Sequence, residues 1–274
     1  MSKKKIMDIF IGAVLFYLLL CGVLYFAQRS MIYFPDKTKP TLIDGAEGVH
    51  VTTDDGQTIE SWFFKATDND KPVLIYFHGN AGNYGDRYYK AAPYIQAGYG
   101  VLLAEYRGYG GNKGDISEQG IYNDARAQMT WLIQEKNIPL DRIVIYGESI
   151  GTGAAVQMAN EFRAKALILE APFSSLYEMA GRLYPMIPIQ YLLKDKYMNI
   201  DKIASIHMPV LIIHGQKDAT IPIVLAEKLF DSAVEPKEFI AFPQAGHNNL
   251  YNFGAYSRVI SFLTGIGRDN DDNE

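Results

Sequence analysis

The sequence is poor in the residues that build disulfides and metal sites. It contains one cysteine, Cys21, and five histidines in 274 residues. A single cysteine excludes an intrachain disulfide, and the scattered histidines form no His-x-x-x-His pair or cysteine cluster of the kind that binds zinc. The glycine-rich segment 108–114 lacks the Gly-Lys-Ser/Thr signature of a phosphate-binding loop. We therefore expect no metal and no cofactor.

The chain also lacks a surplus of positive charge. Its net charge is -5, which provides no basic surface for nucleic acid. Hydrophobic residues make up 48% and charged residues 21%, values typical of a globular chain. A length of 274 residues suits one α/β domain with a substantial core. No feature of the sequence indicates the oligomeric state.

The N-terminal segment lacks charge over a length that matches a bilayer. Residues 9–27 form an apolar run of 19 residues, close to the ~20 needed to cross a membrane as a helix. We expect residues 1–29 to be an uncleaved single-pass anchor. The three lysines at 3–5 favour a cytoplasmic N-terminus, with the rest of the chain on the non-cytoplasmic side. Arg29, Lys37 and Lys39 weaken this orientation.

Two other interpretations of the N-terminal segment stay open. A cleaved signal peptide has a shorter apolar core and a small-x-small cleavage site, but Tyr25 stands where the first small residue is required. A lipoprotein signal could end at Cys21, but Leu20 stands where a small residue is expected.

Beyond residues 30–48, which form a linker or strap, apolar runs alternate with helix-like stretches. This alternation predicts a mostly parallel sheet with helices on both faces. Polar and acidic residues 267–274 predict a tail. The expected strands are 57–65, 73–77, 99–104, 143–146, 166–169, 210–213 and 237–242, and the expected helices are 87–96, 117–136, 152–162, 221–233 and 251–264.

About forty residues separate the strands at 166–169 and 210–213, which is too many for a simple connection. Within them, residues 183–193 are apolar and interrupted by prolines. We expect residues 172–207 to form a small cap that offers an apolar wall to a substrate. A helical crossover that packs on the core is the alternative.

Ser149 lies in the run Gly147-Glu148-Ser149-Ile150-Gly151, which fits the G-x-S-x-G pattern of a nucleophile elbow. The β-branched run at 142–146 predicts a strand before it, and the small residues at 152–159 predict a helix after it. This is the context that the motif requires, so we expect Ser149 to be a nucleophile and not part of an ordinary glycine-rich turn.

A serine nucleophile needs a base and an orienting carboxylate, which follow an elbow serine in the order acid, then histidine. His247 lies in a loop between the last expected strand and helix, where it can reach the serine. His214 ends a buried strand and is expected to pack there. Asp218 follows the same strand and is the expected acid, although it could instead cap the next helix. Glu170 is the rival acid.

Acyl transfer places negative charge on the carbonyl oxygen, and two backbone N–H groups commonly stabilise it. We expect one from Ile150, directly after the serine, and the other from Asn80 in the loop 78–83, with Ala81 as the alternative. His78 is expected to hold that loop by hydrogen bonds.

Six motifs in this order resemble the α/β-hydrolase superfamily and, within it, the Bem46-like serine hydrolases, relatives of membrane-associated protein depalmitoylases. The resemblance covers residues 49–263 and implies an α/β-hydrolase fold, a Ser149–Asp218–His247 triad and no cofactor. Glu105 departs from the pattern, since relatives commonly carry aspartate there. The motifs are His78-Gly79-Asn80-Ala81-Gly82-Asn83, Tyr106-Arg107-Gly108-Tyr109-Gly110, Gly147-Glu148-Ser149-Ile150-Gly151, Leu169-Glu170-Ala171-Pro172-Phe173, His214-Gly215-Gln216-Lys217-Asp218 and Gly246-His247.

The sequence thus predicts a hydrolase domain over residues 49–266. The leading hypothesis is a membrane-anchored serine hydrolase that cleaves an ester or thioester with a small-molecule or lipid-like acyl group. A serine aminopeptidase shares this fold and triad and is the alternative. A non-catalytic binding protein on a hydrolase scaffold is the third possibility. The sequence does not name the physiological substrate.

Overall fold

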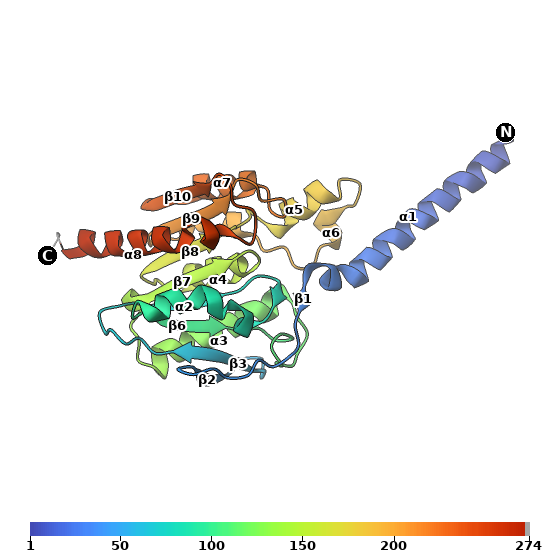
Figure 1. Cartoon of the computed structure of the whole chain (residues 1–274). Helices are drawn as coiled ribbons and strands as arrows, with labels where there is room; N and C mark the ends of the chain where they lie inside the picture. The colour runs from blue at the N-terminus through green and yellow to red at the C-terminus, as the bar shows by residue number, and fades with distance from the viewer. Residues whose placement is uncertain (272–274) are drawn as a thin grey trace.

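The computed structural model describes residues 1–271, and its centre is an eight-stranded sheet (Figure 1). Strand order across the sheet is β10-β9-β8-β7-β4-β6-β3-β2. The six strands from β10 to β6 are parallel, whereas β3 and β2 add an antiparallel edge. The strands are β2 (Glu47–Thr52), β3 (Thr58–Phe64), β4 (Val73–Phe77), β6 (Gly100–Ala104), β7 (Ile143–Glu148), β8 (Ala166–Glu170), β9 (Val210–Gly215) and β10 (Lys237–Phe242).

Helices cover both faces of the sheet, as the alternating pattern predicts. Buried residues of α3 (Glu118–Gln134), α4 (Gly151–Glu161) and α7 (Ile223–Ser232) join one core layer. Those of α2 (Tyr88–Gln96) and α8 (Ala255–Asp271) join the other. The apolar strand runs alternate their side chains between these two layers, because successive residues of a strand point to opposite faces.

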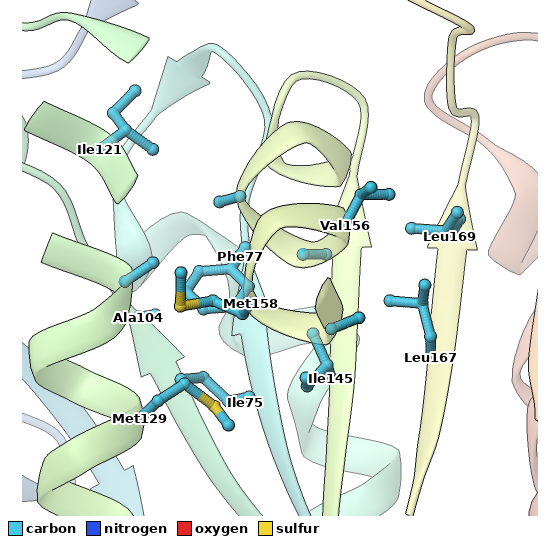
Figure 2. Close-up of a cluster of buried hydrophobic side chains, with 14 of the residues drawn as sticks. Ile75, Phe77, Ala104, Ile121, Met129, Ile145, Val156, Met158, Leu167 and Leu169 are labelled. Atoms are coloured by element: carbon cyan, nitrogen blue, oxygen red, sulfur yellow. The ribbon is translucent and has the colours of Figure 1, made fainter. Parts of the chain in front are cut away.

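The core layer beneath α3 and α4 shows how the sequence positions the elbow. The strand residues Ile75, Ile145 and Leu167 belong to one buried cluster with Met129 of α3 and Met158 of α4 (Figure 2). Burial of side chains of this size contributes about 1.5–3 kcal/mol each. This packing fixes α4, and therefore the turn that precedes it, against the carboxyl ends of the parallel strands.

The N-terminal helix α1 (Lys3–Ile32) continues three residues beyond the expected boundary at residue 29. It is the one candidate for a membrane span in the described part of the chain, and the mean hydropathy of its most apolar window is 2.5. Figure 1 shows it projecting away from the sheet. In the segment expected to be a linker or an ordered strap, the chain then forms β1 (Phe34–Pro35), which pairs in parallel with β5 (Ala81–Gly82).

The expected cap contains the short helices α5 (Leu176–Leu183) and α6 (Ile189–Leu192), followed by 3₁₀ turns at Asn199–Asp201 and Ile203–Ser205. Ser175 begins α5 by accepting a hydrogen bond from the Glu178 N–H. At the other end of the chain, α8 continues to Asp271, so the expected tail at 267–274 is helical where it is described. Residues 272–274 lie outside the described residues.

Candidate active site

Ser149 lies on a sharp turn between β7 and α4. Its backbone φ is 53°, a left-handed conformation that is unusual for a residue with a side chain. The Ser149 N–H donates to the Glu170 carbonyl at 2.8 Å, which holds the turn against β8. A Cβ on Gly147 would lie 2.6 Å from that of Ala155, and one on Gly151 would lie 2.5 Å from the His78 carbonyl oxygen. Both glycines are therefore required by close approach of the backbone.

The structure brings the three predicted triad side chains together. His247 Nε2 lies 3.0 Å from the Ser149 Oγ, and His247 Nδ1 lies 2.7 Å from Asp218 Oδ2. His247 belongs to the loop that follows β10, and Asp218 to the loop that follows β9. These loops meet because parallel neighbouring strands place their carboxyl ends at one edge of the sheet.

Asp218 is held as a carboxylate. Its Oδ1 accepts hydrogen bonds from the Thr220 and Ile221 N–H groups, each at 2.8 Å. Burial alone would raise the pKa of Asp218, but these bonds and the one to His247 outweigh burial and lower that pKa below its ordinary value. These two bonds order the loop before α7 and do not cap that helix, whose first turn follows Pro222 and has no side-chain cap.

Within the described residues, the rival side chains of Glu170 and His214 form no hydrogen bond with Ser149 or His247, although His214 Nε2 lies 3.4 Å from Asp218 Oδ2. The Glu170 carboxylate accepts hydrogen bonds from the Lys90 ammonium and the Tyr146 hydroxyl, each at 2.7 Å. His214 is fully buried, and its Nε2 is bonded to the Ile221 carbonyl at 2.9 Å. Burial lowers the pKa of His214, which favours a neutral ring beneath the Asp218 loop.

The predicted oxyanion residues flank the serine. Asn80 and Ile150 both line the cavity that contains Ser149. Within residues 1–271, neither of their backbone N–H groups has an intramolecular hydrogen-bond acceptor. Ala81, the alternative, lies in β5. His78 is bonded to the Gly79 carbonyl and to Glu105, as expected for a residue that holds this loop. Glu105 also accepts from the Tyr84 and Tyr106 N–H groups, so its role is structural.

The structure contains a buried ionic network around Glu148, the residue before the serine, that the sequence did not predict. Lys90 lies between Glu148 and Glu170, at 3.1 and 2.7 Å, and Arg87 lies 3.0 Å from Glu148. Burial would raise the pKa of Glu148, but the two cations hold it far below its usual range. Arg87 also donates to the Ala81 carbonyl at 2.9 Å, which connects the elbow to the predicted oxyanion loop. The sequence signal was the acidic residue directly before the serine, since a carboxylate at a buried strand end needs a partner.

The chain segment after α1 is also part of the site, which the prediction of a strap did not foresee. The Asn80 side-chain amide donates to the Ile32 carbonyl at 2.8 Å, and the Phe34 N–H donates to the Asn80 carbonyl at 3.1 Å. The Tyr109 hydroxyl donates to the same carbonyl at 2.9 Å. The last turn of α1 and strand β1 therefore hold the predicted oxyanion loop in place.

Ser149 opens into a cavity of about 420 Å³, a size common for small-molecule sites. Its walls come from α1, the predicted oxyanion loop, the expected cap and the loops that follow β9 and β10. No group of three or more histidine, cysteine or acidic residues within the described chain is arranged to hold a metal ion. The apolar side chains that line the cavity are Leu24, Met31, Ile32, Ala81, Ile150, Phe173, Leu176, Met179, Ala180, Leu183, Tyr184, Ile187, Ile189, Leu192, Leu193 and Ile221.

This fold, with a serine on an elbow facing a histidine–carboxylate pair, defines an α/β hydrolase. A family model described as alpha/beta hydrolase fold matches residues 72–196. The esterase Pf2001 of Pyrococcus furiosus shares the fold, with a TM-score of 0.68 over 84% of this chain and 98% of that one at 19% identity.

The chain belongs to the Bem46-like family of α/β hydrolases, as its motifs predicted. It is 31% identical to protein bem46 of Schizosaccharomyces pombe over 89% of this chain and 88% of that protein. It is 39% identical to the protein Rv2307c of Mycobacterium tuberculosis over 83% of this chain and 84% of that protein. The family and the predicted α/β-hydrolase fold are thereby confirmed.

Proposed function

We propose that this hydrolase cleaves esters or thioesters through Ser149, His247 and Asp218, with Ile150 and Asn80 supplying the oxyanion hole. The observation that carries the proposal is the unbroken line of hydrogen bonds from Asp218 Oδ2 through both His247 nitrogens to the Ser149 Oγ, at 2.7 and 3.0 Å. Such a line lets the imidazole accept the serine proton while the carboxylate stabilises the resulting imidazolium.

The chemistry follows from this geometry. As the Ser149 Oγ attacks the acyl carbon, its proton passes to His247 Nε2, and the carbonyl oxygen becomes an oxyanion facing the Asn80 and Ile150 N–H groups. The intermediate collapses when His247 returns the proton to the leaving alkoxide or thiolate, which leaves an acyl group on Ser149. His247 then deprotonates a water that attacks this ester, and the acid product and free serine follow.

The test is labelling with a fluorophosphonate probe. The full-length protein should be labelled on Ser149, and Ser149→Ala should abolish both labelling and hydrolysis of p-nitrophenyl butyrate. The melting temperature should be unchanged, because alanine removes one hydroxyl and no core volume. Labelling of Ser149→Ala at another serine would refute the assignment, and absence of labelling in the wild type would favour the non-catalytic alternative.

The cavity favours an acyl substrate over a peptide N-terminus. Sixteen apolar side chains line it, and its one carboxylate among the described residues, Glu148, is already paired with Lys90 and Arg87. Each CH₂ of a bound chain could add up to ~0.8 kcal/mol of transition-state binding until the pocket is full. We expect kcat/KM to rise from p-nitrophenyl acetate through butyrate to hexanoate, and aminoacyl anilides to be poor substrates. A steady fall from acetate onward would refute an acyl pocket, and preference for the anilides would favour a peptidase.

We also propose that α1 anchors the enzyme in a membrane with the hydrolase domain on the non-cytoplasmic side. The uncharged stretch 9–27 within α1 is long enough, and the lysines at 3–5 favour a cytoplasmic N-terminus. A reporter enzyme that works only outside the cytoplasm should be active when it is fused after Glu274. Activity of a reporter that works only in the cytoplasm would contradict this topology. A mature protein that starts near Gln28 would show that the segment is a cleaved signal peptide.

A further inference from the structure

The tip of the cap is an exposed apolar surface with no charge. Between Leu183 and Leu193 the sequence has no acidic or basic residue. Met186 is 83% exposed, Tyr191 78% and Leu183 63%, although a soluble surface rarely groups large apolar side chains in this way. We call residues 183–193 the cap tip.

The cap tip runs alongside α1 and not away from it. The Tyr17 hydroxyl donates to the Met186 carbonyl at 2.8 Å. Further along both segments, the Gln28 amide donates to the Leu192 carbonyl at 2.9 Å. Figure 1 shows α5 and α6 on the side of the domain from which α1 projects. The tip is therefore level with the middle of the expected span 9–27, since Tyr17 precedes its end by ten residues, ~15 Å along a helix.

Charged residues begin where the membrane boundary is expected. Arg29 forms an ion pair with Asp195 at 2.9 Å. The Lys194 ammonium lies 4.0 Å from the centre of the Tyr25 ring. Tyrosine and basic side chains are typical of the membrane–water interface. With these four residues at the boundary, Tyr17 and Met186 lie on its lipid side.

The catalytic cavity reaches this same surface. Leu24, Gln28 and Met31 of α1 form one of its walls, at the spacing of a single helix face. Leu183 and Tyr184 of the cap tip line the cavity and are also 63% and 42% exposed. Through Leu183 and Tyr184, the apolar wall of the cavity thus continues onto the outer surface of the tip.

We infer that the cap tip is embedded in the bilayer beside α1 and that the substrate is a membrane-resident ester or thioester. Its acyl chain would pass from the lipid, between α1 and the cap, to Ser149, without crossing water. The partner of this surface is the acyl-chain region of a phospholipid bilayer. The inference rests on the proposed anchoring and hydrolysis and adds a second membrane contact, an entry route and a substrate class to them.

Insertion of the tip can be measured without catalysis. In the full-length protein with Cys21→Ala, single cysteines at Met186, Leu15 and Tyr89 would carry a fluorophore. They would be reconstituted in phosphatidylcholine vesicles that contain nitroxide-labelled phosphatidylcholine. Leu15 lies within the span, and Tyr89 is an exposed residue of α2, at 59%. We expect lipid quenching at positions 15 and 186 and none at 89. Quenching at 15 but not at 186 would overturn this inference alone, whereas no quenching at 15 would overturn the anchoring and the inference with it.

Entry from the bilayer can be measured with a matched pair of variants. Tyr191 does not line the cavity, so Tyr191→Glu should hydrolyse water-soluble p-nitrophenyl butyrate at the wild-type rate. The same variant should hydrolyse 4-methylumbelliferyl palmitate in phosphatidylcholine vesicles about ten-fold more slowly, because a carboxylate is disfavoured in lipid. The control Tyr89→Glu should behave as wild type with both substrates.

The remaining outcomes of this experiment would each refute one part of the inference. Wild-type hydrolysis of the bilayer substrate by Tyr191→Glu would overturn the entry route. Loss of both activities would assign Tyr191 a structural role and also overturn it. If the wild type hydrolyses neither substrate, the proposed hydrolysis fails, and the entry route fails with it, whatever the quenching at position 186.

Discussion

Replacement of Asp218 by asparagine tests the site most directly, because it changes one proton and almost no volume. In the wild type, Asp218 Oδ2 accepts the proton of His247 Nδ1, so that the lone pair of Nε2 faces the serine hydroxyl. An amide at this position donates to Nδ1 instead. The ring proton then moves to Nε2, where it faces Ser149 and prevents the imidazole from acting as a base.

The magnitude follows from this loss of the reactive tautomer. In a serine protease with the same kind of triad, replacement of the aspartate by asparagine lowers kcat about 10⁴-fold. We expect a similar loss, which corresponds to about 5 kcal/mol of transition-state stabilisation. Stability should fall much less, because the remaining oxygen of the amide can still accept from the Thr220 and Ile221 N–H groups.

The comparison variant is Glu170→Gln, at the rival position. Its carboxylate pairs with the buried Lys90, so the change should lower the free energy of unfolding by about 1–3 kcal/mol, as expected for a weakened buried bond. Its kcat should stay within about ten-fold of wild type, because the Glu170 carboxylate bonds to Lys90 and Tyr146 and not to His247. A ten-fold change corresponds to ~1.4 kcal/mol of transition-state stabilisation. Both variants would be assayed with p-nitrophenyl butyrate and by urea unfolding. A larger loss of kcat in Glu170→Gln than in Asp218→Asn would refute the assignment of the acid.

Two further predictions concern packing and pH. Gly151→Ala should destabilise the fold by about 1–3 kcal/mol in urea unfolding and reduce activity, because the new Cβ would meet the His78 carbonyl. The control Gly265→Ala, on an open face of α8, should stabilise the fold by about 0.5–1 kcal/mol. Equal effects of the two changes would contradict the close approach at Gly151. The folded-state pKa of Asp218 is lowered, so its contribution to stability is present above its ordinary value of about 3.9 and lost as pH falls through the folded value. The stability gap between wild type and Asp218→Asn should therefore narrow from pH 5 toward about pH 3, and a gap that widens would contradict the sign of the shift.

The parts of this fold that the sequence predicts are those with a local cause. Buried parallel strands are continuous apolar runs, and each of the seven expected strands overlaps one in the structure. The elbow is visible in the sequence because close approach of the backbone requires glycine at two positions of one turn, 147 and 151, which are four residues apart. Asp218 and His247 could be chosen from sequence because each follows a strand whose carboxyl end must lie at the same edge as that of β7.

The parts that the sequence did not predict depend on contacts between distant segments. Strand β1 has two residues and exists only because β5 lies beside it. Lys90 sits in an amphipathic helix, and nothing near it in the sequence shows that two carboxylates from other strands surround it. The sequence does not predict the edge strand β2, which straddles the expected boundary between strap and hydrolase domain, because its half-exposed pattern is weaker than the apolar run of a buried strand.

The most consequential of these distant contacts joins the proposed anchor to the proposed catalytic site. Only Tyr33 separates α1 from β1, and it is buried, with its hydroxyl 2.9 Å from that of Tyr197. Within two residues the chain passes from the end of α1 to a strand that holds the oxyanion loop. An anchor on a flexible linker would let the enzyme face the membrane at any angle. Here α1, which forms part of the cavity wall, runs directly into the strand that holds the loop near Ser149, so the direction in which the proposed anchor enters a bilayer also sets the direction in which the cavity opens.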